Sequence, residues 1–133
     1  MPHAASDEAD DEAAVLVVED DAILALELSQ TFRRHGVSVL GPYPTYRRAL
    51  EAIAQSRPRR AVLDIDLGAG DLRPGFEGER LLAVLTSAGC RCVVHSGRAE
   101  LFRSITSRFP GVTLIPKPTR IERVVEALLQ PAR

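Results

Sequence analysis

The sequence predicts a doubly wound α/β domain with a five-stranded parallel sheet, and three observations support this. Short apolar runs alternate five times with amphipathic stretches between residues 14 and 129, as in successive βα units. The apolar runs are continuous, which is typical of strands that helices cover on both faces. A chain of 133 residues, 45% hydrophobic and 26% charged, fits one globular domain.

The first strand and helix form the clearest pair. The run Val15–Val18 is aliphatic throughout and predicts a central strand. Asp21 is a suitable N-cap for a helix at residues 22–35, and Gly36 stands where a left-handed residue closes a helix. Three apolar side chains of this helix share one stripe: Leu24, Leu28 and Phe32.

The second pair is shorter. Residues 37–40 predict a strand that Gly41-Pro42 breaks. Thr45 is a suitable N-cap for the following helix, and Pro58 ends the pair. The helix should turn three apolar residues inward: Ala49, Leu50 and Ile53.

The third and fourth pairs lie on either side of residue 90. A strand at residues 61–63 runs into Asp64, and after a long glycine-rich loop a helix is expected to open at Gly78. A strand at residues 90–95 follows, and then a helix that Pro110-Gly111 stops. The side chains of this helix that should face the core are Phe102, Ile105 and Phe109.

The fifth pair completes the pattern. Residues 112–115 predict the last strand, and Thr119 with Glu122 has the spacing of a capping box. The helix that follows should bury Ile121, Val124, Val125 and Leu128.

Composition restricts the kind of protein. Residues 1–13 are acidic with almost no large apolar side chain, so we expect a disordered tail before one domain at residues 14–133. The chain shows neither a signal-peptide pattern nor a membrane-spanning run, so we expect a cytoplasmic protein without membrane contact. A net charge of -1 argues against direct DNA binding. Cys90 and Cys92 are expected to be reduced, partly buried thiols rather than a metal site with His95.

Polar residues gather where the predicted strands end. Glu19, Asp20 and Asp21 follow the first strand, and Asp64, Ser96 and Lys117 follow the third, fourth and fifth. In a parallel doubly wound sheet these carboxyl ends share one edge, where ligands bind. We therefore expect the four positions to converge on one pocket.

The residue types in this pocket indicate phosphoryl chemistry on a carboxylate. Clustered carboxylates repel each other unless a cation neutralises them, and Mg²⁺ prefers oxygen ligands, which suits Asp20 and Asp64 with Glu19 acting directly or through water. Asp64 can then attack phosphorus as a nucleophile, while Lys117 and Ser96 bind the transferred oxygens.

These motifs resemble the signatures of response-regulator receiver domains, in the correct order from about Val15 to Leu129. They are Val17-Val18-Glu19-Asp20-Asp21, Leu63-Asp64, Val94-His95-Ser96-Gly97 and Pro116-Lys117-Pro118. The resemblance implies a flavodoxin-like (βα)5 fold with strand order 2-1-3-4-5. It also implies a cis peptide bond between Lys117 and Pro118.

The resemblance assigns a role to each site residue. Asp64 corresponds to the phosphoacceptor, Ser96 to the switch hydroxyl and Lys117 to the phosphate-sensing lysine. Glu19 and Asp20 correspond to the acidic pair that binds Mg²⁺ together with Asp64, and Asp66 would offer its backbone carbonyl to the metal. Neither His95 nor His35 receives a role.

Three features depart from the family pattern. Leu114 stands where the family commonly has an aromatic residue that moves inward on activation. The loop at residues 68–78 is longer and richer in glycine than usual. Asp66 and Arg98 stand two residues beyond active-site positions, and their opposite charges suggest a pair.

The resemblance also implies function and partners. A sensor histidine kinase or histidine phosphotransfer protein would phosphorylate Asp64, with slow autodephosphorylation rather than enzymatic turnover. Because no output domain follows Leu129, we expect output through a downstream protein, and a second copy of the chain is a further candidate partner. A basic surface near the last two helices is a candidate docking face, formed by Arg98, Arg103, Arg108, Arg120 and Arg123. Two alternatives stay open: a haloacid-dehalogenase-like phosphohydrolase and a degenerate receiver that signals without phosphate.

Overall fold

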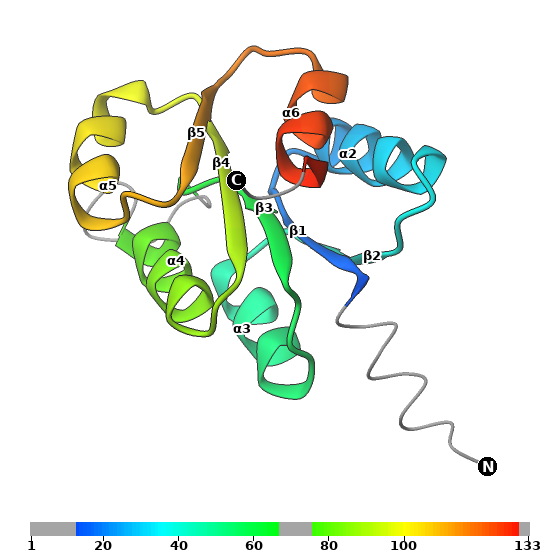
Figure 1. The fold of residues 1–133 in the computed structure, drawn as a ribbon, viewed down its shortest axis with the longest axis horizontal. Coiled ribbons are helices and arrows are strands. Elements are labelled where there is room, and N and C mark those ends of the chain that lie inside the picture. The colour runs from blue at the N-terminus through cyan, green and yellow to red at the C-terminus, as the bar shows by residue number, and fades with distance from the viewer. Residues whose placement is uncertain (1–12, 67–75, 131–133) are drawn as a thin grey trace.

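The computed structural model describes residues 13–66 and 76–130 and confirms the predicted fold class (Figure 1). Five parallel strands form one sheet in the order β2-β1-β3-β4-β5. The strands are β1 (Val15–Val18), β2 (Val39–Tyr43), β3 (Arg60–Leu63), β4 (Arg91–Ser96) and β5 (Thr113–Pro116). The helices are α2 (Ala22–Arg34), α3 (Tyr46–Gln55), α4 (Phe76–Ser87), the 3-10 turn η1 (Ala99–Leu101), α5 (Phe102–Arg108) and α6 (Ile121–Leu129).

Two of the expected features lie outside the residues that the structure describes. Residues 1–12, which make up nearly all of the expected acidic tail, lie outside the described residues. The same holds for residues 67–75, the greater part of the expected long loop after Asp64.

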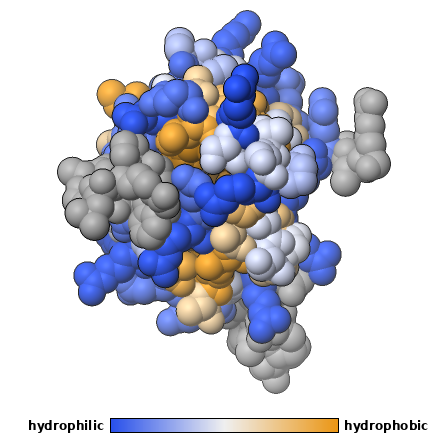
Figure 2. Space-filling model, turned by 90° about the vertical axis from the view of Figure 1, so that its left-hand side faces the viewer, coloured by the Kyte–Doolittle hydropathy of each residue, from blue (hydrophilic) through white to orange (hydrophobic). Residues whose placement is uncertain are grey.

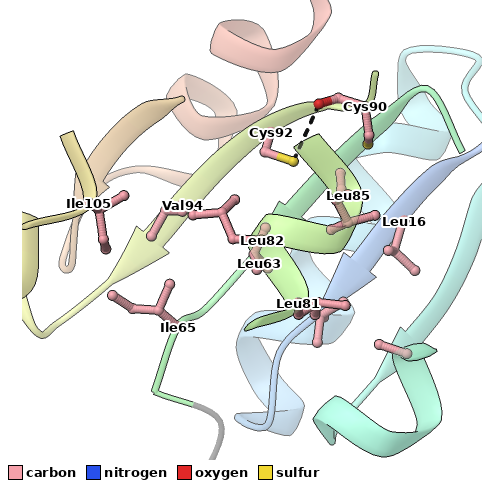
Figure 3. Close-up of a cluster of buried hydrophobic side chains, with 13 residues drawn as sticks. Leu16, Leu63, Ile65, Leu81, Leu82, Leu85, Cys90, Cys92, Val94 and Ile105 are labelled. Carbon is pink, nitrogen blue, oxygen red and sulfur yellow. Dashed lines mark hydrogen bonds between the residues drawn. The ribbon is translucent and has the colours of Figure 1, made fainter. Parts of the chain in front are cut away.

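The sheet separates two apolar layers, which explains the continuous apolar runs. Alternate residues of β1 point to opposite faces, so that Leu16 and Val18 join one layer while Val15 and Val17 join the other. The first layer packs under α3, α4 and α5, and Figure 3 shows its buried side chains around β3 and β4. The second layer packs against α2 and α6, which lie together on the other face in Figure 1.

Helix α2 begins and ends as the sequence predicts. The Asp21 carboxylate accepts hydrogen bonds from the backbone amides of Ile23 and Leu24 at 2.9 and 3.1 Å and caps the helix. Leu28 and Phe32 are fully buried, whereas Leu24 is only partly buried. Gly36 follows with φ +78°, the left-handed conformation expected at a helix end.

Strand β2 differs from the prediction at both ends. It starts at Val39 and continues through Gly41-Pro42 to Tyr43, so this dipeptide does not break the strand. β2 is an edge strand that pairs only with β1, and an edge tolerates the missing amide of proline. Gly41 is required there, because its φ is +99° and a Cβ atom would lie 2.8 Å from the Tyr43 nitrogen.

The other elements match the prediction to within a few residues. Thr45 caps α3 by accepting a hydrogen bond from the Arg48 amide at 3.2 Å, and Ala49 is buried. Helix α4 begins at Phe76, two residues before Gly78. Strand β4 extends through Ser96. Helix α5 is short, and Phe109, which was expected within it, is its C-cap residue.

The predicted capping box of the last helix does not form. The Thr119 hydroxyl donates to the carbonyl of Pro116, and Arg120 at the N-cap makes no capping bond through its side chain. The Glu122 carboxylate instead lies 3.1 Å from Nε2 of His35, which is the C-cap residue of α2. A tertiary contact between side chains has replaced the local bond. Val124, Val125 and Leu128 are buried as expected, whereas Ile121 is only partly buried.

Two expectations about composition concern the described residues. Cys90 and Cys92 are free, buried thiols, and among the residues described here neither belongs to a cluster that could hold a metal ion. Within the same residues, every helix is too short or too polar to cross a membrane. Figure 2 shows the side that carries α4 and α5, where separate apolar areas lie among hydrophilic residues.

Candidate functional site

The predicted site residues meet at the carboxyl ends of four neighbouring strands, β1, β3, β4 and β5. Glu19 follows β1 and Asp64 follows β3, and their exposed fractions are only 2% and 6%. Lys117 follows β5 and places its Nζ 2.9 Å from Glu19 Oε1 and 2.9 Å from Asp64 Oδ2. Four strand ends thus supply one cluster, because the fully buried Ser96 ends β4 beside them.

Backbone amides hold the two buried carboxylates in place. The Asp21 amide donates to Glu19 Oε2 at 3.1 Å, and the Asp66 amide donates to Asp64 Oδ1 at 2.9 Å. Each carboxylate therefore has one oxygen bound to the main chain and the other bound to Lys117. This arrangement fixes both carboxylates before any ligand arrives.

Ser96 and Lys117 are positioned by neighbouring backbone. The Lys117 amide donates to the Ser96 carbonyl at 2.9 Å, which continues the β4–β5 ladder beyond the strand ends. Ser96 Oγ accepts from the Arg98 amide at 3.0 Å, so its own hydroxyl proton is available for another acceptor. The Lys117-Pro118 peptide bond is cis, as the resemblance implies.

Three carboxylates form a group suited to a hard cation. Oxygen atoms of Glu19, Asp20 and Asp64 all lie within 4.8 Å of one another, and Asp20 is exposed while the other two are buried. Carboxylate oxygens are the ligands that Mg²⁺ prefers, so this donor set fits the predicted ion. The backbone carbonyl of Asp66 as a further ligand stays a prediction.

Burial and neighbouring charges shift three pKa values in the cluster. Burial raises the pKa of Glu19 to about 7, although hydrogen bonds from Lys117 and the Asp21 amide act in the opposite direction. Burial would lower the pKa of Lys117, but its hydrogen bonds to Asp64 and Glu19 outweigh burial and raise it. Burial and the Lys117 ammonium lower the pKa of His95 to about 4.

Other residues singled out in the sequence lie apart from this cluster. Arg98 does not pair with Asp66, because its Nε lies 2.9 Å from Glu100 Oε2 in the adjacent turn. Leu114 packs against the apolar layer below α5, where its side chain is half-buried. Arg108 forms an ion pair with Glu79, so that two of the five basic candidates for docking, Arg98 and Arg108, have partners within the fold.

Sequence reasoning placed His95 in the fourth strand but gave it no role at the site. This side chain is 2% exposed, and the charges of Lys117 and Asp64 both act on it. The signal was present in the sequence, since a polar residue interrupts the apolar run of β4 just before Ser96.

Comparison with known proteins gives matches of fold. No protein-family model matches the sequence, and no curated protein matches it. A CheY-like response regulator receiver domain protein from Methanospirillum hungatei JF-1 superposes with a TM-score of 0.68 at 23% identity, over 86% of this chain and 88% of that chain. A response regulator receiver protein from Sinorhizobium medicae WSM419 gives 0.71 at 22% identity, over 87% and 90%.

A third match was solved in a modified state. It is a response regulator protein from Burkholderia pseudomallei with a phosphorylated aspartic acid, a calcium ion and citrate. The TM-score is 0.70 at 22% identity, over 88% of this chain and 66% of the Burkholderia protein, so this chain spans about two thirds of its length. The strand order, the helices on both faces and these matches agree, and the chain has the fold of a response-regulator receiver domain.

Proposed function

We propose that this chain is a receiver domain of two-component signalling that accepts a phosphoryl group on Asp64. The donor is a sensor histidine kinase or a histidine phosphotransfer protein, and the modification changes a face that binds a downstream protein. One observation carries the proposal: Lys117 lies 2.9 Å from both Asp64 and Glu19 at the edge where the parallel strands end. In this kind of sheet that edge is the usual place for ligands.

The residues present account for the transfer step. A carboxylate oxygen of Asp64 forms a bond to phosphorus while the bond from phosphorus to the donor's imidazole nitrogen breaks, and the imidazole leaves with the electron pair of that bond. No general base is needed, since an ionised carboxylate has no proton to lose. Lys117 and the Ser96 hydroxyl then bind oxygens of the transferred group.

The acidic group supplies a place for the metal. Glu19, Asp20 and Asp64, with the backbone carbonyl of Asp66, would hold Mg²⁺, which neutralises charge on the phosphoryl oxygens when it is bound. The Burkholderia structure supports this assignment, because it holds a phosphorylated aspartic acid and a calcium ion in the same fold.

Output is proposed to run through protein contact. One similar structure is described as a DNA-binding response regulator from Staphylococcus aureus, but a net charge of -1 does not favour such binding by this chain. The basic docking face then depends on Arg103, Arg120 and Arg123, which are all exposed. Charge reversal at Arg103 and Arg123 is expected to weaken binding of the downstream protein, and unchanged binding would contradict this part of the proposal.

Chemical phosphorylation tests the central claim. The protein is incubated with Mg²⁺ and acetyl phosphate or phosphoramidate, and intact mass is followed for a labile gain of one phosphoryl group. We expect stoichiometric labelling that Asp64→Asn abolishes and that Glu51→Gln, an exposed carboxylate on α3, leaves intact. Absence of labelling with every donor would instead indicate a degenerate receiver. Rapid turnover of phosphomonoesters would indicate a phosphohydrolase, and either result would overturn the proposal.

A further inference from the structure

Lys117 reaches across a whole strand to contact Asp64. Lys117 follows β5, Asp64 follows β3, and β4 lies between these strands in the sheet. The register pairs Leu63 with Val94 and His95 with Ile115, so His95 is the β4 residue in the row between Asp64 and Ile115. The side chain of Lys117 must therefore pass over β4 near His95.

The imidazole of His95 lies on the same side of the sheet as this ion pair. Val62 and Val93 belong to the apolar layer under α2 and α6, and residues two positions further along a strand share their face. Asp64 and His95 are those residues. The pKa of His95 responds to the charges of both Lys117 and Asp64, which agrees with this placement.

His95 is buried without hydrogen bonds. It is 2% exposed, and within the described part of the chain neither Nδ1 nor Nε2 has a partner. Buried polar groups nearly always have partners, and an unpaired one costs stability that an apolar side chain would not. The ring is neutral, because burial and the Lys117 ammonium disfavour its protonation, so one of its nitrogens is a free acceptor.

Cation binding would release the donor that this acceptor lacks. Lys117 now binds Glu19 and Asp64, which are two of the three carboxylates that form the proposed cation group. A divalent cation on the same oxygens repels the ammonium and competes with it for lone pairs. An ammonium carries three donors, and a buried one that loses a carboxylate needs another acceptor.

We propose that His95 is a positioning residue for Lys117, accepting a hydrogen bond from its ammonium, directly or through one buried water, once a cation occupies the acidic group. This inference rests on the proposed function. The proton stays on Lys117 throughout, and no bond other than hydrogen bonds forms or breaks. In this way His95 keeps the ammonium beside Asp64, where the phosphoryl group arrives, instead of letting it move to solvent.

The sequence offers a direct probe, since Lys117 is its only lysine. Protein containing ¹⁵N-labelled lysine gives one side-chain ammonium signal, which can be followed by NMR during a titration with Mg²⁺ alone. The variants are His95→Leu, which removes the acceptor, and His95→Gln, which retains one. His35→Gln, at an exposed histidine that pairs with Glu122, is the matched control.

The expected result separates the two proposals. In the wild type, His95→Gln and His35→Gln, saturating Mg²⁺ shifts the ammonium signal, which stays visible because the protons remain hydrogen-bonded. In His95→Leu the signal should be lost to exchange with water at saturation, and calorimetry should show Mg²⁺ binding weaker by about tenfold. If His95→Leu keeps the wild-type signal and affinity, the inference is wrong while the proposed function stands. If Mg²⁺ does not bind the wild type at all, the proposed function itself fails.

Stability gives an independent readout. His95→Leu should unfold at an equal or higher temperature than the wild type, because it removes two unpaired polar atoms from an apolar layer. His95→Val, which matches the neighbouring residues of β4, serves as a second apolar variant if leucine proves too large. A clear loss of stability in both apolar variants would show that the imidazole has a partner in the cation-free protein, and it would overturn the inference.

Discussion

Glu19 and His95 are buried groups whose pKa values are shifted in opposite directions. We predict that their effects on the pH dependence of stability nearly cancel, so that replacing either residue reveals the effect of the other. Glu19 and His95 are each 2% exposed. Burial, the largest cause in both cases, raises the pKa of Glu19 from 4.5 to about 7 and lowers the pKa of His95 from 6.5 to about 4. The two perturbations are Glu19→Gln and His95→Leu.

The signs follow from proton binding in the folded and unfolded states. Between about pH 4.5 and 7 the folded chain keeps a proton on Glu19 that the unfolded chain has released, so stability falls as pH rises. Between about pH 4 and 6.5 the unfolded chain binds a proton on His95 that the folded chain does not, so stability rises with pH. Each separation is about 2.5 pH units, which corresponds to at most about 3 kcal/mol. The two effects nearly cancel in the wild type.

Urea unfolding followed by far-UV circular dichroism, from pH 4 to 8 with a chelator present, checks this prediction. The free energy of unfolding should rise with pH in Glu19→Gln and fall with pH in His95→Leu, each by about 1 to 3 kcal/mol. Glu51→Gln, at an exposed carboxylate, should follow the wild-type profile. Parallel pH profiles in all four proteins would refute the reasoning.

Three further predictions concern the core, the edge strand and the site. Phe32→Ala removes a fully buried ring between α2 and the sheet. In urea titrations it should lower the free energy of unfolding by about 3 to 5 kcal/mol, and an effect below about 1 kcal/mol would contradict the described packing. Gly41→Ala should cost more than about 1 kcal/mol by the same measurement, because φ is +99° and the new Cβ would meet the Tyr43 nitrogen at 2.8 Å. Lys117→Met should slow labelling of Asp64 by acetyl phosphate about a hundredfold in intact-mass time courses, and a wild-type rate would remove Lys117 from the proposed step.

The sequence predicted most reliably the elements whose two faces are both buried. Val15–Val18 is apolar at every position because α2 and α6 cover one face of β1 while α3 and α4 cover the other. Strand β2 lies at the edge, and its course through Gly41-Pro42 depends on pairing with β1 and on the register shift between Leu16 and Val18. Local turn signals carry no information about such pairing, so the predicted break was wrong.

The site was predictable to the extent that topology decides it. Strand ends of a parallel sheet share one edge, and this alone brings Glu19, Asp64 and Lys117 together. Side-chain partners were not predictable, because the positions of the side chains in the packed fold decide them. Arg98 therefore pairs with Glu100 rather than Asp66, and Glu122 pairs with His35 instead of closing a capping box.

The charges of the site explain why its carboxylates can be buried before a ligand binds. Glu19, Asp20 and Asp64 carry up to three negative charges, and Lys117 balances one of them. The raised pKa of Glu19 lets a proton neutralise part of the remainder near pH 7, and the exposed Asp20 is stabilised by water. A divalent cation would replace that proton and match the remaining charge of two. The cation-free cluster is therefore stabilised by the Lys117 ammonium and by a labile proton on Glu19. When the cation binds, the proton is released and the ammonium loses carboxylate contacts.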